Sequence, residues 1–155
     1  MAVAAHVAVP FWPVPLTLQT LALMLLGAFA GPAVAVAALL VYVAEGLAGL
    51  PVFAHGSGPA VLVGPTGGYL IGYVLAAAIP VYAARMKRGI TGALAAGAVF
   101  LAADAVIFFC GVAWLSTLVG VEKAVAGGLV PFLAGEALKI AIATAAVQLR
   151  AAPRA

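Results

Sequence analysis

Apolar residues run along this chain in long stretches that are separated by Gly and Pro rather than by charged loops. A helix that spans the hydrocarbon core of a membrane needs about 20 mainly apolar residues. The pattern predicts five such helices, preceded by an apolar stretch at residues 2–9 that is only about half a span long. We place the five longer helices at about residues 16–31, 33–49, 68–85, 91–118 and 130–149.

Proline and glycine mark where these helices should end or bend. Three prolines within residues 10–15 remove backbone donors and exclude a regular helix, so we expect an extended crossing there, with Trp12 at the membrane interface. Gly31-Pro32 suits the end of one helix and the start of the next. Pro80 predicts a kink in the helix at 68–85, and Gly111 a bend in the helix at 91–118.

Composition identifies the class of protein. Hydrophobic residues make up 67% of the 155 residues and charged residues only 7%, whereas soluble chains are about 45–50% apolar and about 25% charged. The sequence therefore predicts an all-α integral membrane protein, formed by one domain over residues 1–155. We expect a bundle of six transmembrane helices, of which the first is short.

Positive charge predicts the orientation of the bundle. Five of the seven Lys and Arg residues form two groups, Arg85, Lys87 and Arg88 after the fourth span and Arg150 and Arg154 after the last one. By the positive-inside rule both groups are cytoplasmic, so both termini should be cytoplasmic. The connections at 50–67 and 119–129 should then face outward.

Glu136 and Lys139 are the most informative charged residues, because they lie in an otherwise apolar helix. Positions i and i+3 share one helix face, so carboxylate and ammonium can meet or grip one ligand together. An intramembrane charge costs about 2.5–3.5 kcal/mol on insertion scales and usually marks a functional site. At 1.5 Å per residue the pair should lie roughly 9 Å below the outer surface. The alternative is an ion pair that only fixes helix packing.

The connection at residues 49–69 is unusually apolar for a loop and dense in Gly and Pro. We expect it to fold back over the bundle, where Phe53 or Tyr69 could cover a ligand; alternatively it is a connector without ligand contact. Its glycines resemble a phosphate cradle only superficially, since the chain has no G-x-x-x-x-G-K-[ST] motif. ATP hydrolysis by a P-loop is therefore excluded.

The remaining chemically active side chains do not form an enzyme site in the sequence. Cys110 is the sole cysteine, and His6 and His55 have no partner at metal-ligand spacing, so we expect neither metal nor cofactor. Asp104 is a second intramembrane acid that could serve helix packing. An intramembrane enzyme using Glu136 or Asp104 is disfavoured because no nucleophile and base accompany them. A channel is disfavoured because the Glu–Lys pair cancels its own charge.

Four sequence blocks together resemble the BioY family, the biotin-binding S components of energy-coupling factor (ECF) transporters. The blocks are VPLTLQT at 14–20, GLPVFA at 49–54, GPTGGYL at 64–70 and FLAGEALK at 132–139, in family order. Two features depart from the family pattern: the first helix is short, and Glu136 stands where the family more commonly has Asp.

The resemblance implies a membrane-embedded subunit of the S-component fold that captures biotin from outside. It also implies delivery together with a transmembrane T component and a pair of ATPases, in a bacterial or archaeal plasma membrane. A carboxylate such as Glu136 can accept from a ureido N–H of biotin, and Lys139 can donate to the ureido oxygen or to the terminal carboxylate. An S component for another small vitamin is the alternative. The expected ligand-binding residues are Glu136, Lys139, Gln19, Thr17, Phe53, Thr66, Gly67, Tyr69 and Trp114, with Tyr42 as a further wall residue.

Docking to a T component needs small residues that allow close helix approach. The resemblance implies such a motif on the first segment, where Ala4-x-x-x-Ala8 supplies it. The motifs Gly27-x-x-x-Gly31 and Gly68-x-x-x-Gly72 are the alternatives.

Overall fold

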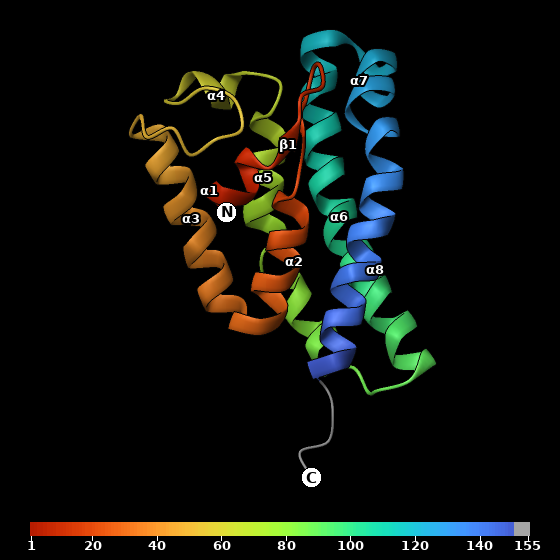
Figure 1. Cartoon of the computed structure of the whole chain (residues 1–155). Coiled ribbons are helices and arrows are strands. Elements are labelled where there is room, and N and C mark those ends of the chain that lie inside the picture. The colour runs from red at the N-terminus through yellow and green to blue at the C-terminus, as the bar shows by residue number, and fades with distance from the viewer. Residues whose placement is uncertain (151–155) are drawn as a thin grey trace.

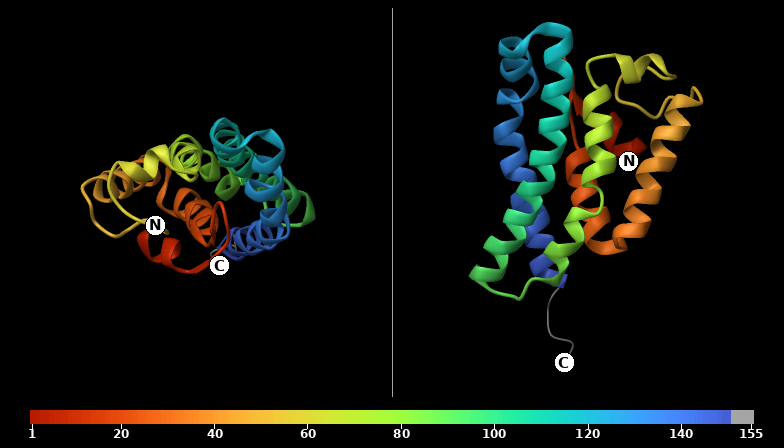
Figure 2. Two further views of the ribbon diagram at one scale, coloured as in Figure 1. Left: turned by 90° about the horizontal axis from the view of Figure 1, so that it is seen from above. Right: turned by 180° about the vertical axis from the view of Figure 1, so that it is seen from behind.

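The computed structural model describes residues 1–150, which form a bundle of helices arranged roughly along one axis (Figures 1 and 2). The expectation of a mainly helical protein is confirmed. The elements in chain order are α1 Ala2–His6, β1 Ala8–Val9, β2 Leu16–Thr17, α2 Gln19–Ala30, α3 Pro32–Leu47, α4 Ala60–Val63, α5 Gly67–Ala76, η1 Ile79–Arg85, α6 Ile90–Val119, α7 Val121–Gly128, η2 Val130–Phe132 and α8 Leu133–Arg150.

Two helical stretches are long and apolar enough to cross a membrane, Ile90–Val119 and Val121–Arg150, each of 30 residues. The bent pair of α5 and η1 makes a third if it is counted as one span. Helices α2 and α3 are also apolar but shorter, with 12 and 16 residues. The protein is thus a multi-pass membrane protein, but a count of six spanning helices is not confirmed.

Proline and glycine act as predicted at one bend and differently at the other. α5 and η1 meet at an angle of 40°, with Pro80 at the start of η1, so the predicted kink is confirmed. α6 instead continues as one α-helix through Gly111. A side chain at Gly111 would overlap the ring of Tyr69, so the glycine there permits close packing of α5 on α6.

The chain before α2 differs most from expectation. Residues 10–15 are not an extended crossing but the tip of a hairpin, in which β1 pairs antiparallel with β2. Trp12 at this tip is 76% exposed. The hairpin returns the chain to α1, because the Leu18 amide lies within hydrogen-bond distance of the Ala4 and Val7 carbonyls.

The small-residue face predicted for the first segment does not exist as a helix face. α1 ends at His6, and Ala8 belongs to β1, so Ala4 and Ala8 do not share a helix. The hairpin accounts for this, because Ala8 pairs with Thr17 of β2. The N-terminus lies midway along the bundle in Figure 1, not at the end where α8 finishes.

The alternative glycine motifs pack helices inside the bundle. Gly27 lies against Pro80, and Gly68 and Gly72 of α5 lie against Trp114 and Ile107 of α6. Gly27, Gly68 and Gly72 therefore permit close helix packing inside the bundle, whereas Gly31 lies at the end of α2 with open space beside it.

The described residues of the two basic groups lie at one end of the bundle, as predicted. The Gln148 side chain near the end of α8 accepts from the Gly89 amide at 3.1 Å and donates to the Lys87 carbonyl at 3.2 Å. This bridge holds the segment with Arg85, Lys87 and Arg88 beside Arg150. Arg154 lies outside the described residues.

At the opposite end, the expected outward connections contain structure of their own. The segment 119–129, predicted as a connection, includes the eight-residue helix α7. The segment between α3 and α5 includes the single turn α4. Both lie at the top of Figure 1, away from the basic end.

Candidate functional site

A buried ion pair lies in the first turns of α8. The Lys139 ammonium and a Glu136 carboxylate oxygen are 2.7 Å apart, and their side chains are only 11% and 8% exposed. The expectation that these two residues meet on one helix face is confirmed. Because they are shielded from water, their charges interact strongly with each other and with neighbouring dipoles.

The start of α2 completes this polar cluster. Thr20 donates to the second oxygen of Glu136 at 2.7 Å, and Lys139 donates to the Thr20 hydroxyl at 3.0 Å and to the Thr17 carbonyl at 2.6 Å. All three ammonium donors therefore have acceptors. Sequence reasoning missed Thr20, although it ends the same sequence block that contains Thr17.

Asp104 on α6 belongs to the same cluster, which sequence reasoning also missed. It is only 4% exposed and interacts electrostatically with Glu136 and Lys139. Neither carboxylate oxygen has a hydrogen-bond partner within residues 1–150. An acid facing another acid in this way can be inferred only once α6 and α8 are placed side by side.

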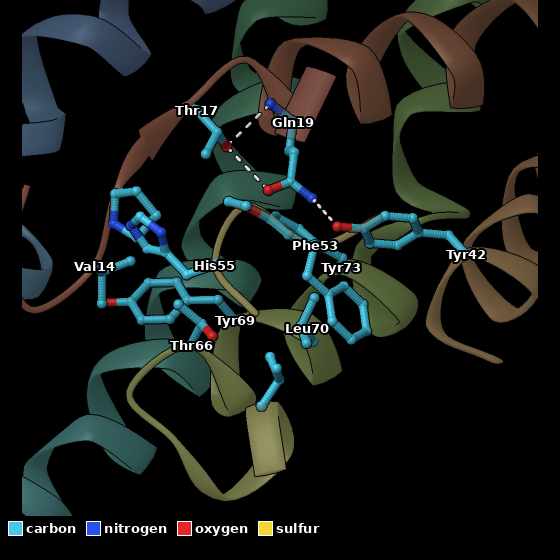
Figure 3. Close-up of a pocket in the computed structure, with 13 residues that line it drawn as sticks. Val14, Thr17, Gln19, Tyr42, Phe53, His55, Thr66, Tyr69, Leu70 and Tyr73 are labelled. Atoms are coloured by element: carbon cyan, nitrogen blue, oxygen red, sulfur yellow. Dashed lines mark hydrogen bonds between the residues drawn. The ribbon is translucent and has the colours of Figure 1, made fainter. Parts of the chain in front are cut away.

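A second set of polar contacts joins α2 to α3 (Figure 3). Gln19 donates through its amide nitrogen to the Tyr42 hydroxyl at 2.8 Å and accepts from the Thr17 hydroxyl at 3.1 Å. The Thr17 hydroxyl in turn accepts from the Gln19 backbone amide at 3.3 Å. Thr17 thus belongs to both polar sets, through its carbonyl in one and its hydroxyl in the other.

The segment between α3 and α5 folds back over the bundle, as its apolar sequence predicts. The ring of Phe53 is buried against Gly46 of α3, where no side chain could fit, and meets Tyr42 edge to face at 5.3 Å between ring centroids. The Gly58 amide donates to the Gly46 carbonyl at 2.7 Å. Farther along, the Trp114 indole N–H donates to the Gly64 carbonyl at 3.0 Å.

Tyr69 lies between this segment and the polar cluster. Its hydroxyl donates to the Gly128 carbonyl at 2.6 Å, and its ring meets Phe108 edge to face. Phe108 meets Phe132 in the same way, so three rings form a row from α5 to the start of α8. This row is an apolar wall next to the charged residues.

Two small cavities adjoin these side chains. The first, of about 30 Å³, lies under the folded-back segment and is drawn in Figure 3. The second, of about 20 Å³, reaches Thr20 and Glu136. Both are lined by Val14, Pro15, Thr17, Tyr69 and Tyr73, which form the partition between them.

The cavities bring together most of the residues expected to bind ligand. Thr17, Gln19, Phe53, Thr66 and Tyr69 line the first cavity, together with Tyr42 and His55. Glu136 lines the second cavity, and both Glu136 and Lys139 line a surface groove between the hairpin and α8. Gly67 and Trp114 line neither cavity.

Gly67 and Trp114 act instead on the segment that covers the cavities. Gly67 packs on the backbone of Leu62, and Trp114 holds Gly64. Within residues 1–150, no group of three or more His, Cys, Asp and Glu side chains is arranged to hold a metal ion.

Comparisons with known proteins point in one direction. The sequence profile of the BioY family matches residues 1–154. The chain is 38% identical over 143 residues to the biotin transporter BioY of Thermotoga maritima, covering 91% of this chain and 83% of that one. It is also 38% identical, over 142 residues and with the same coverage, to a probable biotin transporter BioY of Pyrococcus horikoshii.

A solved structure shares the fold. It is the crystal structure of the S component for biotin from an ECF-type ABC transporter, which matches with a TM-score of 0.78. The match covers 96% of this chain and 84% of that chain at 24% sequence identity. The helix arrangement in Figure 1 is therefore of the S-component type.

Proposed function

The chain belongs to the BioY family, as its four sequence blocks predict, and from this premise we propose that it captures biotin outside the cell and delivers it for uptake as an S component. The family consists of transporters, and the prediction that the chain is not an enzyme is thereby confirmed. The observation that carries the proposal is the buried Glu136–Lys139 pair beside cavities with apolar and aromatic walls.

The chemistry of biotin suits these surroundings. Its bicyclic ring and chain are apolar and would be buried by rings such as those of Tyr69 and Phe53, as in most small-molecule sites. Glu136 can accept from a ureido N–H. Lys139 can donate to a ligand oxygen only by giving up one of its present acceptors, and the Thr17 carbonyl lies at the end of β2, where a small backbone shift would release it.

Binding also requires the two cavities to merge. Pockets for ligands of this kind occupy about 300–1,000 Å³, whereas the cavities here measure about 30 and 20 Å³. We propose that Tyr69 and Tyr73, which separate them, shift together with the segment that carries Phe53. That segment is held to α3 by the buried ring of Phe53 and by the hydrogen bond from Gly58 to Gly46, and to α6 by the hydrogen bond from Trp114 to Gly64, so these contacts would open when it moves.

Orientation supports capture from outside. If the basic end is cytoplasmic, then the folded-back segment and the start of α8 face outward, since they lie at the other end of the bundle (Figure 1). Glu136 in the first turn of α8 is then reached from the outer side. We place the protein in the plasma membrane of a bacterium or archaeon on this basis.

Energy for uptake must come from partner proteins, because the chain has no P-loop. We propose the T component and ATPase pair of an ECF transporter. Since Ala4 and Ala8 do not share a helix, docking would use another apolar face of the bundle.

Isothermal titration of the purified protein in detergent tests the assignment. We expect stoichiometric binding of biotin, and much weaker binding of biotin methyl ester and of analogues with altered rings. If biotin gives no heat of binding while riboflavin or thiamin binds, the chain would instead be assigned as an S component for that other vitamin.

A further inference from the structure

Asp104 is a buried acid that the proposed binding chemistry does not use. Buried polar atoms almost always have hydrogen-bond partners, and an exception calls for a physical explanation. Both Asp104 oxygens are inaccessible to solvent and have no partner among residues 1–150. The charged or titratable groups that interact with Asp104 are Glu136 and Lys139 of α8 and Tyr73 of α5.

The geometry of Glu136 decides which acid can hold a proton. One Glu136 oxygen accepts from Lys139 and the other from Thr20, both at 2.7 Å. These two donors stabilise Glu136 as a carboxylate, which still has free lone pairs to accept further bonds. Helix α6 packs against α8, and Asp104 interacts with Glu136 across this contact. Two carboxylates only accept, so the pair can bond only if Asp104 carries a proton.

Charge balance points the same way. With both acids ionised, this buried cluster would hold two negative charges and the single positive charge of Lys139. An uncompensated charge inside a membrane protein is expensive. One proton on Asp104 makes the cluster neutral and supplies the missing hydrogen bond.

We propose that Asp104 carries a proton and donates it to Glu136, so that Asp104 is a positioning residue whose proton is linked to ligand binding. When Asp104 is neutral, it does not compete with Glu136 or with the ligand for the Lys139 ammonium. Loss of the proton would add a negative charge that competes with Glu136 for Lys139 and opposes an anionic ligand. The linkage to biotin rests on the proposed function, whereas the protonation does not.

Infrared spectroscopy tests the protonation without ligand. At neutral pH the wild-type protein should show the C=O stretch of a protonated carboxyl group, shifted in D₂O and absent from Asp104→Asn. Asn has the size of a protonated Asp and its side-chain amide retains a hydrogen-bond donor, so the variant should still fold. Thr144→Val removes the other buried oxygen that lacks a partner in residues 1–150 and should leave the band intact. Absence of the band, or its persistence in Asp104→Asn, would overturn the assignment.

Titration of biotin affinity against pH tests the linkage. Wild-type affinity should fall by about tenfold, a typical coupling between two sites, as alkaline pH removes the proton. Asp104→Asn should bind biotin at neutral pH and keep its affinity over the same pH range. Identical alkaline profiles of the two proteins would refute the linkage. If neither protein binds biotin, the proposed function and the linkage fail together, while the infrared result still decides the protonation.

Discussion

Lys139→Met is the substitution whose outcome follows most directly from the structure. Methionine fills a similar volume but removes an ammonium that donates to Glu136, to Thr20 and to the Thr17 carbonyl at 2.6–3.0 Å. Glu136 would then keep the Thr20 hydroxyl and the proposed Asp104 proton as donors, and neither of these groups is charged. A buried carboxylate would have lost its counter-charge.

The expected cost is large. Removing one partner of a buried pair destabilises a protein by about 3–5 kcal/mol, because the other charge remains buried and unpaired. In the double variant Glu136→Gln, Lys139→Met that orphaned charge is absent, and the glutamine can still accept from Thr20. We therefore expect the double variant to be more stable than Lys139→Met alone by at least about 1 kcal/mol.

Unfolding in detergent without ligand measures these stabilities, and titration with biotin measures affinity separately. Both variants should bind biotin weakly, since both lack the Lys139 ammonium. Lys123→Met on the exposed surface of α7 is the matched control and should change stability by no more than about 0.5 kcal/mol. If the effects of the two substitutions simply add, or if the folded double variant binds biotin normally, the reasoning about the pair is wrong. Glu136→Asp should retain binding within about tenfold, roughly 1.4 kcal/mol.

Three further outcomes follow from the segment over the cavities and from the missing motif. Trp114→Phe removes the hydrogen bond to the Gly64 carbonyl, which contributes about 1 kcal/mol. Amide hydrogen exchange in residues 50–66 should therefore become faster. Unchanged exchange would contradict the role of Trp114 in holding this segment. Gly46→Ala pushes a methyl group into the ring of Phe53 and should weaken biotin binding, whereas Gly97→Ala, which has room, should not. The purified chain should release no phosphate from ATP, because it has no P-loop.

Much of this protein could be predicted from sequence because the membrane constrains it strongly. Apolar stretches interrupted by Gly and Pro place the helices, since every backbone group in lipid must be satisfied within a helix. The same reasoning singled out Glu136 and Lys139, whose i and i+3 spacing alone brings them to one face. The pairing needed no knowledge of other helices.

The tertiary structure decided everything that depends on contacts between distant segments. Three prolines predicted a break after residue 9, but only the pairing of β1 with β2 turns that break into a hairpin, which removes Ala4 and Ala8 from a common helix. Thr20 and Asp104 lie 116 and 32 positions before Glu136 in the chain, so no local pattern marks them as its neighbours. A charge pair on one helix is fixed by helix geometry, whereas the donors and acids around it are fixed by how α2 and α6 pack against α8.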